Sequence, residues 1–164
     1  MIVTPAVTIR QLLWQTDDIR QLLEIERASF NRYDAYSVED FERWCHYNPD
    51  LCQAAELDGR MAGYLLARLL TGFCDLGSLA IAPAYRRAGV GRALLAELEQ
   101  RLNAAGVPEI QLEVRTSNRS GLAFWRQMGF VPFGTLPAFY QDGEDAVRMR
   151  KELEISRPDW LRPE

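Results

Sequence analysis

The stretch from Tyr85 to Arg92 reads YRRAGVGR and lies between an apolar, strand-like segment and a helix-like one. Gly89 and Gly91 remove side chains where a ligand could touch the backbone, and the first N–H groups of a helix have no intrahelical partners. Three arginines and no acidic residue fall within this stretch, although the whole chain carries a net charge of -4. The stretch therefore predicts a loop that binds a phosphorylated ligand.

Two common nucleotide-binding loops do not fit this stretch. A Walker loop needs Gly-Lys-Ser/Thr, but Gly91 is followed by Arg92 and Ala93. A dinucleotide fingerprint needs a third glycine where Leu94 stands. The alternative to a ligand-binding loop is an ordinary turn from a strand to a helix, in which the two glycines only allow close packing.

Length and composition indicate one folded domain. The chain has 164 residues, of which 48% are hydrophobic and 26% are charged, close to the values of globular proteins. We predict a single domain over residues 1–164, with its core at about 7–153 and a C-terminal tail at 154–164. The net charge of -4 argues against nucleic acid as a partner.

Other partners are also disfavoured by the residue content. Three cysteines without a C-x-x-C pair, together with one histidine, suggest neither a disulfide framework nor a metal site. No apolar run approaches the roughly 20 residues that span a bilayer, so no membrane partner is predicted. Because the N-terminus has no leader pattern, we expect a cytoplasmic protein. The sequence makes no prediction of oligomeric state.

Hydrophobic periodicity and turn residues predict the order β-α-α-β-β-β-α-β-α-β-β. Asp58-Gly59 predicts a tight hairpin turn, Ser37 with Asp40 a capping box, and Thr16 an N-cap. The predicted strands are 7–14, 51–57, 60–70, 74–82, 110–115, 130–136 and 146–153, and the predicted helices are 17–30, 38–47, 91–105 and 118–128. This order predicts a mixed α/β (α+β) fold with a largely antiparallel sheet, since only the step from 74 to 115 favours parallel pairing.

The strand 110–115 alternates, so that Glu113 lies on a polar face with Gln111 and Arg115. From these residues alone, an ion pair or hydrogen bond of Glu113 with one of these two neighbours is the simpler interpretation.

Arg86-x-x-Gly89-x-Gly91 resembles the pyrophosphate loop of the GNAT acetyltransferase superfamily, and further segments extend the resemblance over roughly residues 7–153. The chain is most similar to the ribosomal-protein-alanine and other protein N-terminal acetyltransferases. The segments that carry this resemblance are IERASF (25–30), LAIAP (79–83), LEVRTSN (112–118), MGF (128–130) and DGEDA (142–146). It implies a GNAT fold, in which helices flank both faces of a single mixed and mostly antiparallel sheet. It also implies acetyl-CoA as co-substrate and no metal.

The resemblance assigns roles to individual residues. Glu113 becomes the candidate general base, and Tyr140 lies where relatives place tyrosines that contact the peptide. Relatives usually carry a tyrosine, the proposed acid for the leaving thiolate, where this chain has Trp125, whose indole cannot serve as an acid. One alternative is that the thiolate leaves without full protonation, stabilised by a donor or by water. The other is Tyr140, which is the second candidate catalytic residue. The implied cofactor-binding residues are Leu79, Ala80, Ile81, Arg86, Arg87, Ala88, Gly89, Val90, Gly91, Arg92, Asn118 and Trp125.

The resulting prediction is an N-acetyltransferase that acts by direct attack in a ternary complex, with a protein N-terminal α-amine as the favoured acceptor. A ribosomal protein is one possible acceptor of this kind. One alternative is acetylation of a small amine such as an amino acid, polyamine or antibiotic. Another is a non-catalytic module that binds CoA. Residues 32–36, between the first two helices, are a candidate for recognising the acceptor.

Overall fold

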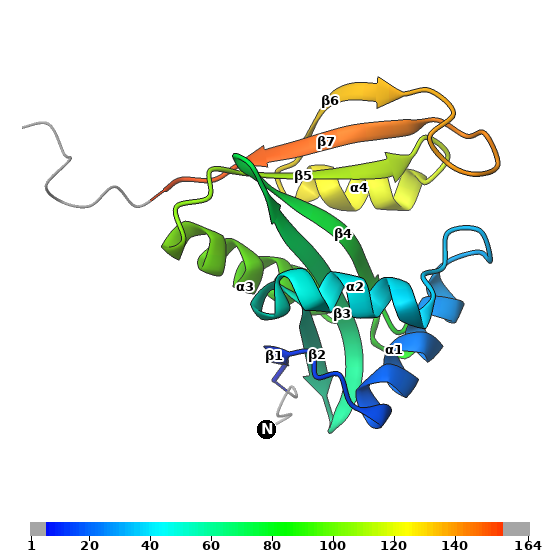
Figure 1. The fold of residues 1–164 in the computed structure, drawn as a ribbon, viewed down its shortest axis with the longest axis vertical. Helices are drawn as coiled ribbons and strands as arrows, with labels where there is room; N and C mark the ends of the chain where they lie inside the picture. Colours follow the sequence, from blue (N-terminus) through cyan, green and yellow to red (C-terminus); the bar gives the residue numbers. More distant parts are fainter. Residues whose placement is uncertain (1–5, 156–164) are drawn as a thin grey trace, which may run out of the picture.

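A computed structural model describes residues 6–155 of the chain, and its elements follow the predicted order (Figure 1). Nearly all of the predicted tail lies outside this range. No helix within 6–155 is long and apolar enough to cross a membrane. The elements are β1 (Thr8–Gln11), α1 (Thr16–Ser29), α2 (Val38–Tyr47), η1 (Pro49–Leu51), β2 (Gln53–Leu57), β3 (Arg60–Leu70), β4 (Phe73–Ile81), η2 (Pro83–Tyr85), α3 (Val90–Ala104), β5 (Glu109–Arg115), α4 (Arg119–Gln127), β6 (Val131–Leu136) and β7 (Ala146–Glu152).

The seven strands form one sheet in the order β1-β2-β3-β4-β5-β7-β6. Every neighbouring pair is antiparallel except β4 and β5, which are parallel as predicted. Apolar residues of α1 and α2 pack with one face of the sheet, and those of α3 and α4 pack with the other. The predicted mixed fold, with helices on both faces of the sheet, is confirmed.

Local signals set several element ends. Ser37 accepts a hydrogen bond from the Asp40 backbone at 3.2 Å, and the Asp40 carboxylate accepts one from Ser37 N–H at 2.9 Å, so the predicted capping box is present. Asp58 and Gly59 both have positive φ, at 53° and 73°, which is the conformation of a two-residue hairpin turn. The prediction of Thr16 as N-cap is wrong. Thr16 is already helical, and Asp18 instead accepts the Leu13 N–H.

A bulge at Gly77 changes which face the side chains of β4 cover. The register shifts there, so that Leu76 pairs with Ala67 while Ser78 pairs with Leu66. Leu76 consequently packs on the α3 side of the sheet, whereas Ala80 packs on the α1 and α2 side. Without the extra residue, strict alternation would direct Leu76 and Ala80 to the same face.

The strands β4 and β5 pair over only two residues, Cys74 with Ile110 and Asp75 with Gln111. Beyond Asp75, β4 has β3 as its only strand partner in the described chain. The backbone of β4 on the β5 side is therefore left without ladder partners, and this opening lies in the middle of the sheet.

Candidate active site

The backbone at the start of α3 has the geometry to bind an anion. Gly89 precedes the helix with φ 79° and no side chain caps the first turn. The N–H groups of Val90, Gly91 and Arg92 begin the helix, where no intrahelical acceptor exists for them. The Ala93 N–H is the first to bond back, to the Gly89 carbonyl oxygen at 3.0 Å. The helix dipole adds to the attraction for negative charge.

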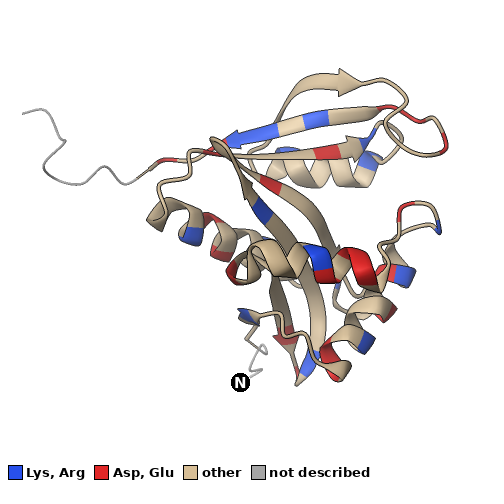
Figure 2. Cartoon of the chain, in the orientation of Figure 1, with Lys and Arg blue, Asp and Glu red and all other residues tan. Residues whose placement is uncertain are grey.

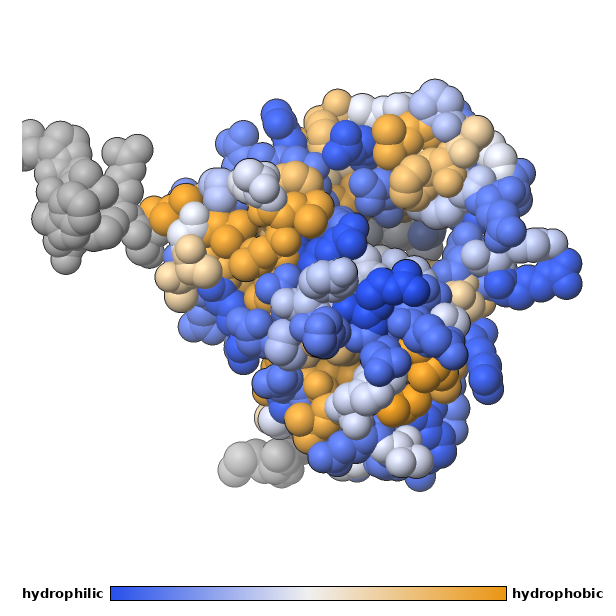
Figure 3. All heavy atoms as spheres, in the orientation of Figure 1, coloured by the Kyte–Doolittle hydropathy of each residue, from blue (hydrophilic) through white to orange (hydrophobic). Residues whose placement is uncertain are grey.

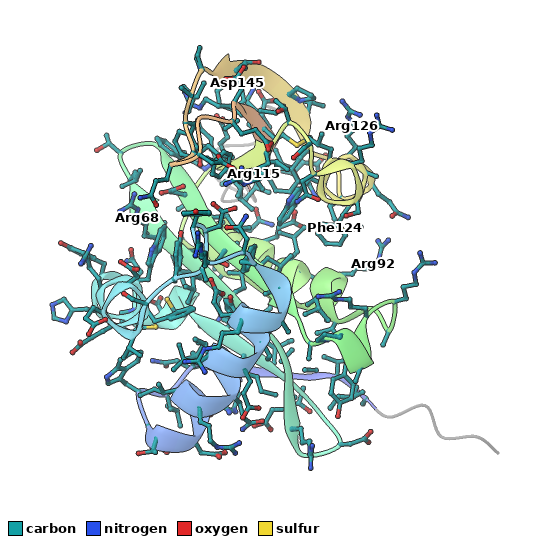
Figure 4. The ribbon with its side chains drawn as sticks, turned by 90° about the vertical axis from the view of Figure 1, so that its right-hand side faces the viewer. Arg68, Arg92, Arg115, Phe124, Arg126 and Asp145 are labelled. Atoms are coloured by element: carbon teal, nitrogen blue, oxygen red, sulfur yellow. The ribbon has the colours of Figure 1, made fainter. Side chains whose placement is uncertain are left out.

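The backbone of this loop is open to a ligand. A Cβ added at Gly89 would meet no heavy atom within 4 Å, while one at Gly91 would lie 3.2 Å from Cζ of Phe124. Figure 4 shows Phe124 of α4 directed toward the start of α3, where Arg92 lies. The residues present thus fit a diphosphate bound to main-chain amides, with Gly91 leaving room between the two helices.

The predicted basic residues of the loop are exposed. Arg86 donates from Nε to the Ile81 carbonyl oxygen at 3.3 Å, and Arg87 adopts a positive φ of 62°. Arg86, Arg87, Ala88 and Arg92 are all exposed. The loop therefore presents its positive charge at the surface rather than in internal ion pairs.

Residues Leu79–Ile81 lie on the part of β4 that has no partner on the β5 side. They pair regularly with β3, from Leu65 to Gly63. The bulge of this strand is at Gly77, two residues before Leu79. Backbone N–H groups beyond Asp75 can therefore face a ligand in the opening between β4 and β5.

Glu113 lies on β5 past the point where its pairing with β4 ends. Its nearest cationic group is Arg148 on β7, with Nε 3.9 Å from Oε1. Burial raises the pKa of Glu113, and the charge of Asp75 raises it further, while Arg148 and Arg68 oppose the shift. A carboxylate with a raised pKa is a better proton acceptor than an exposed one.

The expected pairing of Glu113 with Arg115 or Gln111 is not found. Gln111 donates to Glu109 at 2.9 Å and accepts from Arg148 at 3.0 Å. Arg115 is held by acidic side chains of two loops. Within residues 6–155, the Glu113 carboxylate therefore has only the distant Arg148 contact, and neither Gln111 nor Arg115 bonds to it.

Three further predicted residues lie on or near α4 and in the loop between β6 and β7. Asn118 caps α4 by accepting the Gly121 N–H at 2.9 Å, as expected of an N-cap. Trp125 is 8% exposed and packs edge-on against Phe124 and Phe130, inside the core. Tyr140 lies under the guanidinium of Arg115 at 4.1 Å, and burial raises the pKa of this tyrosine to about 12.

The sequence did not reveal that two aromatic side chains, Tyr36 and Trp44, pack over the bulge at Gly77. Tyr36 donates its hydroxyl to the Gly77 carbonyl oxygen at 3.2 Å and stacks on Trp44 with centroids 6.3 Å apart. A Cβ at Gly77 would overlap the Trp44 ring. No local sequence pattern could show that Trp44 packs on a glycine 33 positions away.

Glu26 is a second feature that the sequence did not reveal. Its side chain is 1% exposed, Oε1 accepts the Tyr36 N–H at 2.8 Å, and Oε2 has no partner in the described chain. Burial raises the pKa of Glu26 to about 7. The carboxyl group is therefore partly protonated near neutral pH.

We expect Glu26→Gln to change how stability depends on pH. The native protein keeps the Glu26 proton from its ordinary pKa of 4.5 up to about 7, so the free energy of unfolding falls as pH rises through this window. The loss amounts to at most about 3 kcal/mol. Glutamine does not titrate but can still accept the Tyr36 N–H. Urea unfolding at pH 5 and pH 8 should therefore show a smaller pH effect in the variant.

Glu24→Gln is the matched control for this prediction, because Glu24 is an exposed carboxylate on the same helix that pairs with Arg20. It should leave the pH dependence as in the unmodified protein. An equal pH slope in the Glu26 variant and the unmodified chain would contradict the assignment.

No group of three or more His, Cys, Asp or Glu side chains in residues 6–155 is arranged to hold a metal ion. The candidate site combines four parts: the helix start of α3, the β4 backbone that has no partner on the β5 side in the described chain, the Glu113 carboxylate with its raised pKa, and Tyr140 against Arg115. These parts can bind a phosphorylated acyl carrier and deprotonate a nucleophile beside it.

Comparison with known proteins points to the same chemistry. Residues 18–130 match the acetyltransferase (GNAT) family. An uncharacterized N-acetyltransferase of Methanocaldococcus jannaschii is 38% identical over 141 residues, covering 85% of this chain and 88% of that protein. An N-alpha-acetyltransferase of Saccharolobus solfataricus is 30% identical over 84% of this chain and 89% of its own length. The crystal structure of the ribosomal-protein-S18-alanine N-acetyltransferase from Escherichia coli superposes with a TM-score of 0.77, at 27% identity, covering 94% of this chain and 98% of that one.

Proposed function

The chain belongs to the acetyltransferase (GNAT) family, and we propose that it transfers acetyl from acetyl-CoA to the α-amine of a protein N-terminus. The observation that carries the proposal is the opening between β4 and β5, which has Glu113 on one side and free amides of β4 on the other. Relatives named as N-alpha-acetyltransferases support the choice of acceptor.

Binding of the co-substrate falls to the backbone. Acetyl-CoA supplies an acetyl group activated as a thioester. The N–H groups of Val90, Gly91 and Arg92 would hold its diphosphate, and exposed Arg86 and Arg87 would add positive charge. Amides of Leu79–Ile81 would bind the pantetheine arm and polarise the acetyl carbonyl.

Glu113 would take the proton from the attacking amine, directly or through water. Transfer forms the bond from the amine nitrogen to the acetyl carbon and breaks the bond from that carbon to sulfur, within a ternary complex. The raised pKa of Glu113 suits an α-amine, whose ordinary pKa is about 7.7–8.0, better than a lysine at about 10.4. Because an α-amine loses its proton more readily than a lysine side chain, the chemistry favours a protein N-terminus as acceptor.

Trp125 on α4 cannot protonate the leaving thiolate, because its only donor is an indole N–H. Tyr140 stays protonated near neutral pH, since burial raises its pKa to about 12. A thiol has a pKa near 8.5, so full proton transfer from Tyr140 to the thiolate would be uphill. We propose that Tyr140 donates a hydrogen bond to the thiolate, which later takes its proton from solvent.

A panel of acceptors tests the proposed function. The protein with acetyl-CoA should release free CoA with peptides that carry an unblocked N-terminus, and mass spectrometry should place the acetyl group on the α-amine. Peptides with a blocked N-terminus and an internal lysine are the control and should react far more slowly. Faster turnover of amino acids, polyamines or aminoglycosides would contradict a protein acceptor. A failure to release CoA with every amine of the panel would contradict catalysis.

A further inference from the structure

Arg115, two residues after Glu113 on the same strand face, joins two loops that are remote in sequence. Its Nε and Nη2 donate to the two carboxylate oxygens of Asp34, both at 2.6 Å. Its Nη1 donates to Asp142 at 2.9 Å and to Glu144 at 3.2 Å. Asp34 belongs to the α1–α2 loop (residues 30–37), and the other two acids belong to the β6–β7 loop (residues 137–145).

These two loops border the opening beside Glu113. Both lie at the same side of the molecule as the end of β5, and the surface is hollowed between the part carrying β5–β7 and the part carrying α1 and α2 (Figures 1 and 3). In residues 6–155, the side-chain hydrogen bonds of Arg115 are the only ones that connect the two loops. Among the side-chain hydrogen bonds of the described residues, the link between the two loops therefore runs through one guanidinium.

Arg115 and its three acidic partners, Asp34, Asp142 and Glu144, form a partly buried cluster, called here the Arg115 hub, rather than an exposed ion pair. The Arg115 side chain is 13% exposed and the Asp34 side chain 17%. The paired geometry with Asp34 engages both oxygens, which fixes orientation as well as distance. On the other side, Glu144 also accepts hydrogen bonds from Ser117 at 2.7 and 2.8 Å, so the β6–β7 loop is tied to the start of α4.

Charge makes the hub sensitive to loss of its arginine. Three carboxylates surround one guanidinium, and Figure 2 shows the acidic residues gathered along the β6–β7 loop. Hydrogen bonding to Arg115 helps to lower the pKa of Asp142 and Glu144, with Ser117 the first cause at Glu144, so both stay ionised at neutral pH. Without Arg115, the acids of the two loops would repel one another.

Exposed aromatic side chains stand beside the hub on each loop. Tyr33, next to Asp34, is 50% exposed, and Phe139, next to Tyr140, is 49% exposed. Tyr140 itself lies against the Arg115 guanidinium. An extended acceptor that reaches Glu113 through the opening would pass between these rings, and their spacing is set by the Arg115 hub.

We propose that Arg115 is a positioning residue for the acceptor: by clamping the α1–α2 loop to the β6–β7 loop, it sets the geometry in which a peptide N-terminus meets Glu113. This inference rests on the proposed function, because it takes a peptide as the acceptor. The clamp acts on acceptor binding, and the acetyl-CoA site at the start of α3 is independent of it.

Kinetics of Asp34→Asn and Arg115→Met test the clamp. Both variants should raise the KM for a peptide acceptor about tenfold or more, which corresponds to the loss of about 1.4 kcal/mol. The KM for acetyl-CoA should stay within twofold of the unmodified enzyme. The double variant should be no worse than Arg115→Met alone, because both changes break the same link. Arg115→Lys keeps the charge without the two-pronged geometry and should restore part of the affinity.

Asp17→Asn is the matched control, since it removes a carboxylate from an arginine pair on α1 remote from both loops. It should leave both KM values unchanged. An unchanged peptide KM in Asp34→Asn and Arg115→Met, or a parallel rise in the KM for acetyl-CoA, would overturn the inference.

Hydrogen exchange separates failure of the clamp from failure of the proposed function. Arg115→Met should speed amide exchange in both loops, and Asp34→Asn should do so in residues 30–37, whether or not the acceptor is a peptide. If Arg115→Met leaves either loop unchanged, the clamp is refuted. If the clamp is present but no peptide is acetylated by the unmodified protein, the proposed acceptor is wrong and a role in peptide positioning falls with it.

Discussion

Gly91→Leu is expected to abolish measurable binding of acetyl-CoA. A Cβ at this position already lies 3.2 Å from Cζ of Phe124, so the longer leucine side chain must displace that ring or enter the space at the helix start. The loss of several charge-assisted hydrogen bonds, each worth about 1.5–3 kcal/mol, predicts an affinity decrease of more than about 100-fold. Isothermal titration calorimetry with CoA measures it directly.

The variant is expected to fold, because Gly91 lies within α3 and leucine has a better helix propensity by about 1 kcal/mol. Gly106→Asn is the matched control at the other end of α3. Gly106 has φ 72° and open space around it, and asparagine tolerates this conformation better than other residues. The control should bind CoA normally. Unchanged affinity in Gly91→Leu would refute the assignment of the helix start as the diphosphate site.

Glu113→Gln should lower kcat by about 100-fold or more while leaving the Kd for acetyl-CoA unchanged, as expected for loss of a general base. Burial and Asp75 raise the pKa of Glu113, so its ionisation should contribute to a rise of activity with pH. The groups that face it and shape this rise are Asp75, Arg68, Arg148 and Tyr140. In Glu113→Gln, only ionisation of the amine should remain in the pH profile.

Glu109→Gln provides the control for this result, since Glu109 lies on the same strand and the same face, four residues from Glu113. It should leave kcat and the pH profile as they are. Steady-state rates across pH 6 to 9 distinguish the two variants. A Glu113→Gln enzyme with an unchanged rate throughout this range would exclude Glu113 as the base.

The candidate site was only partly predictable. The loop around Gly89 and the placement of Glu113 on a polar strand face followed from glycine, helix-start and alternation arguments that need only neighbouring residues. The roles of Tyr140 and of Leu79–Ile81 came from family resemblance. The partners of Arg115 could not be predicted, because Asp34 lies 81 positions away and an arginine followed by Thr-Ser reads locally as a strand end.

The sequence by itself determined the order of helices and strands, the Asp58-Gly59 turn, the Ser37 cap and the start of α3. These features depend on backbone preferences and hydrogen bonds within a few residues, so local composition is enough to fix them. Only the tertiary structure decided that β7 lies between β5 and β6, that Gly77 bulges beneath Trp44, and that Arg115 holds two loops together. Each of these features depends on contacts between segments that are distant in the sequence. Those contacts form only when the strands have assembled into the sheet and the helices have packed on it.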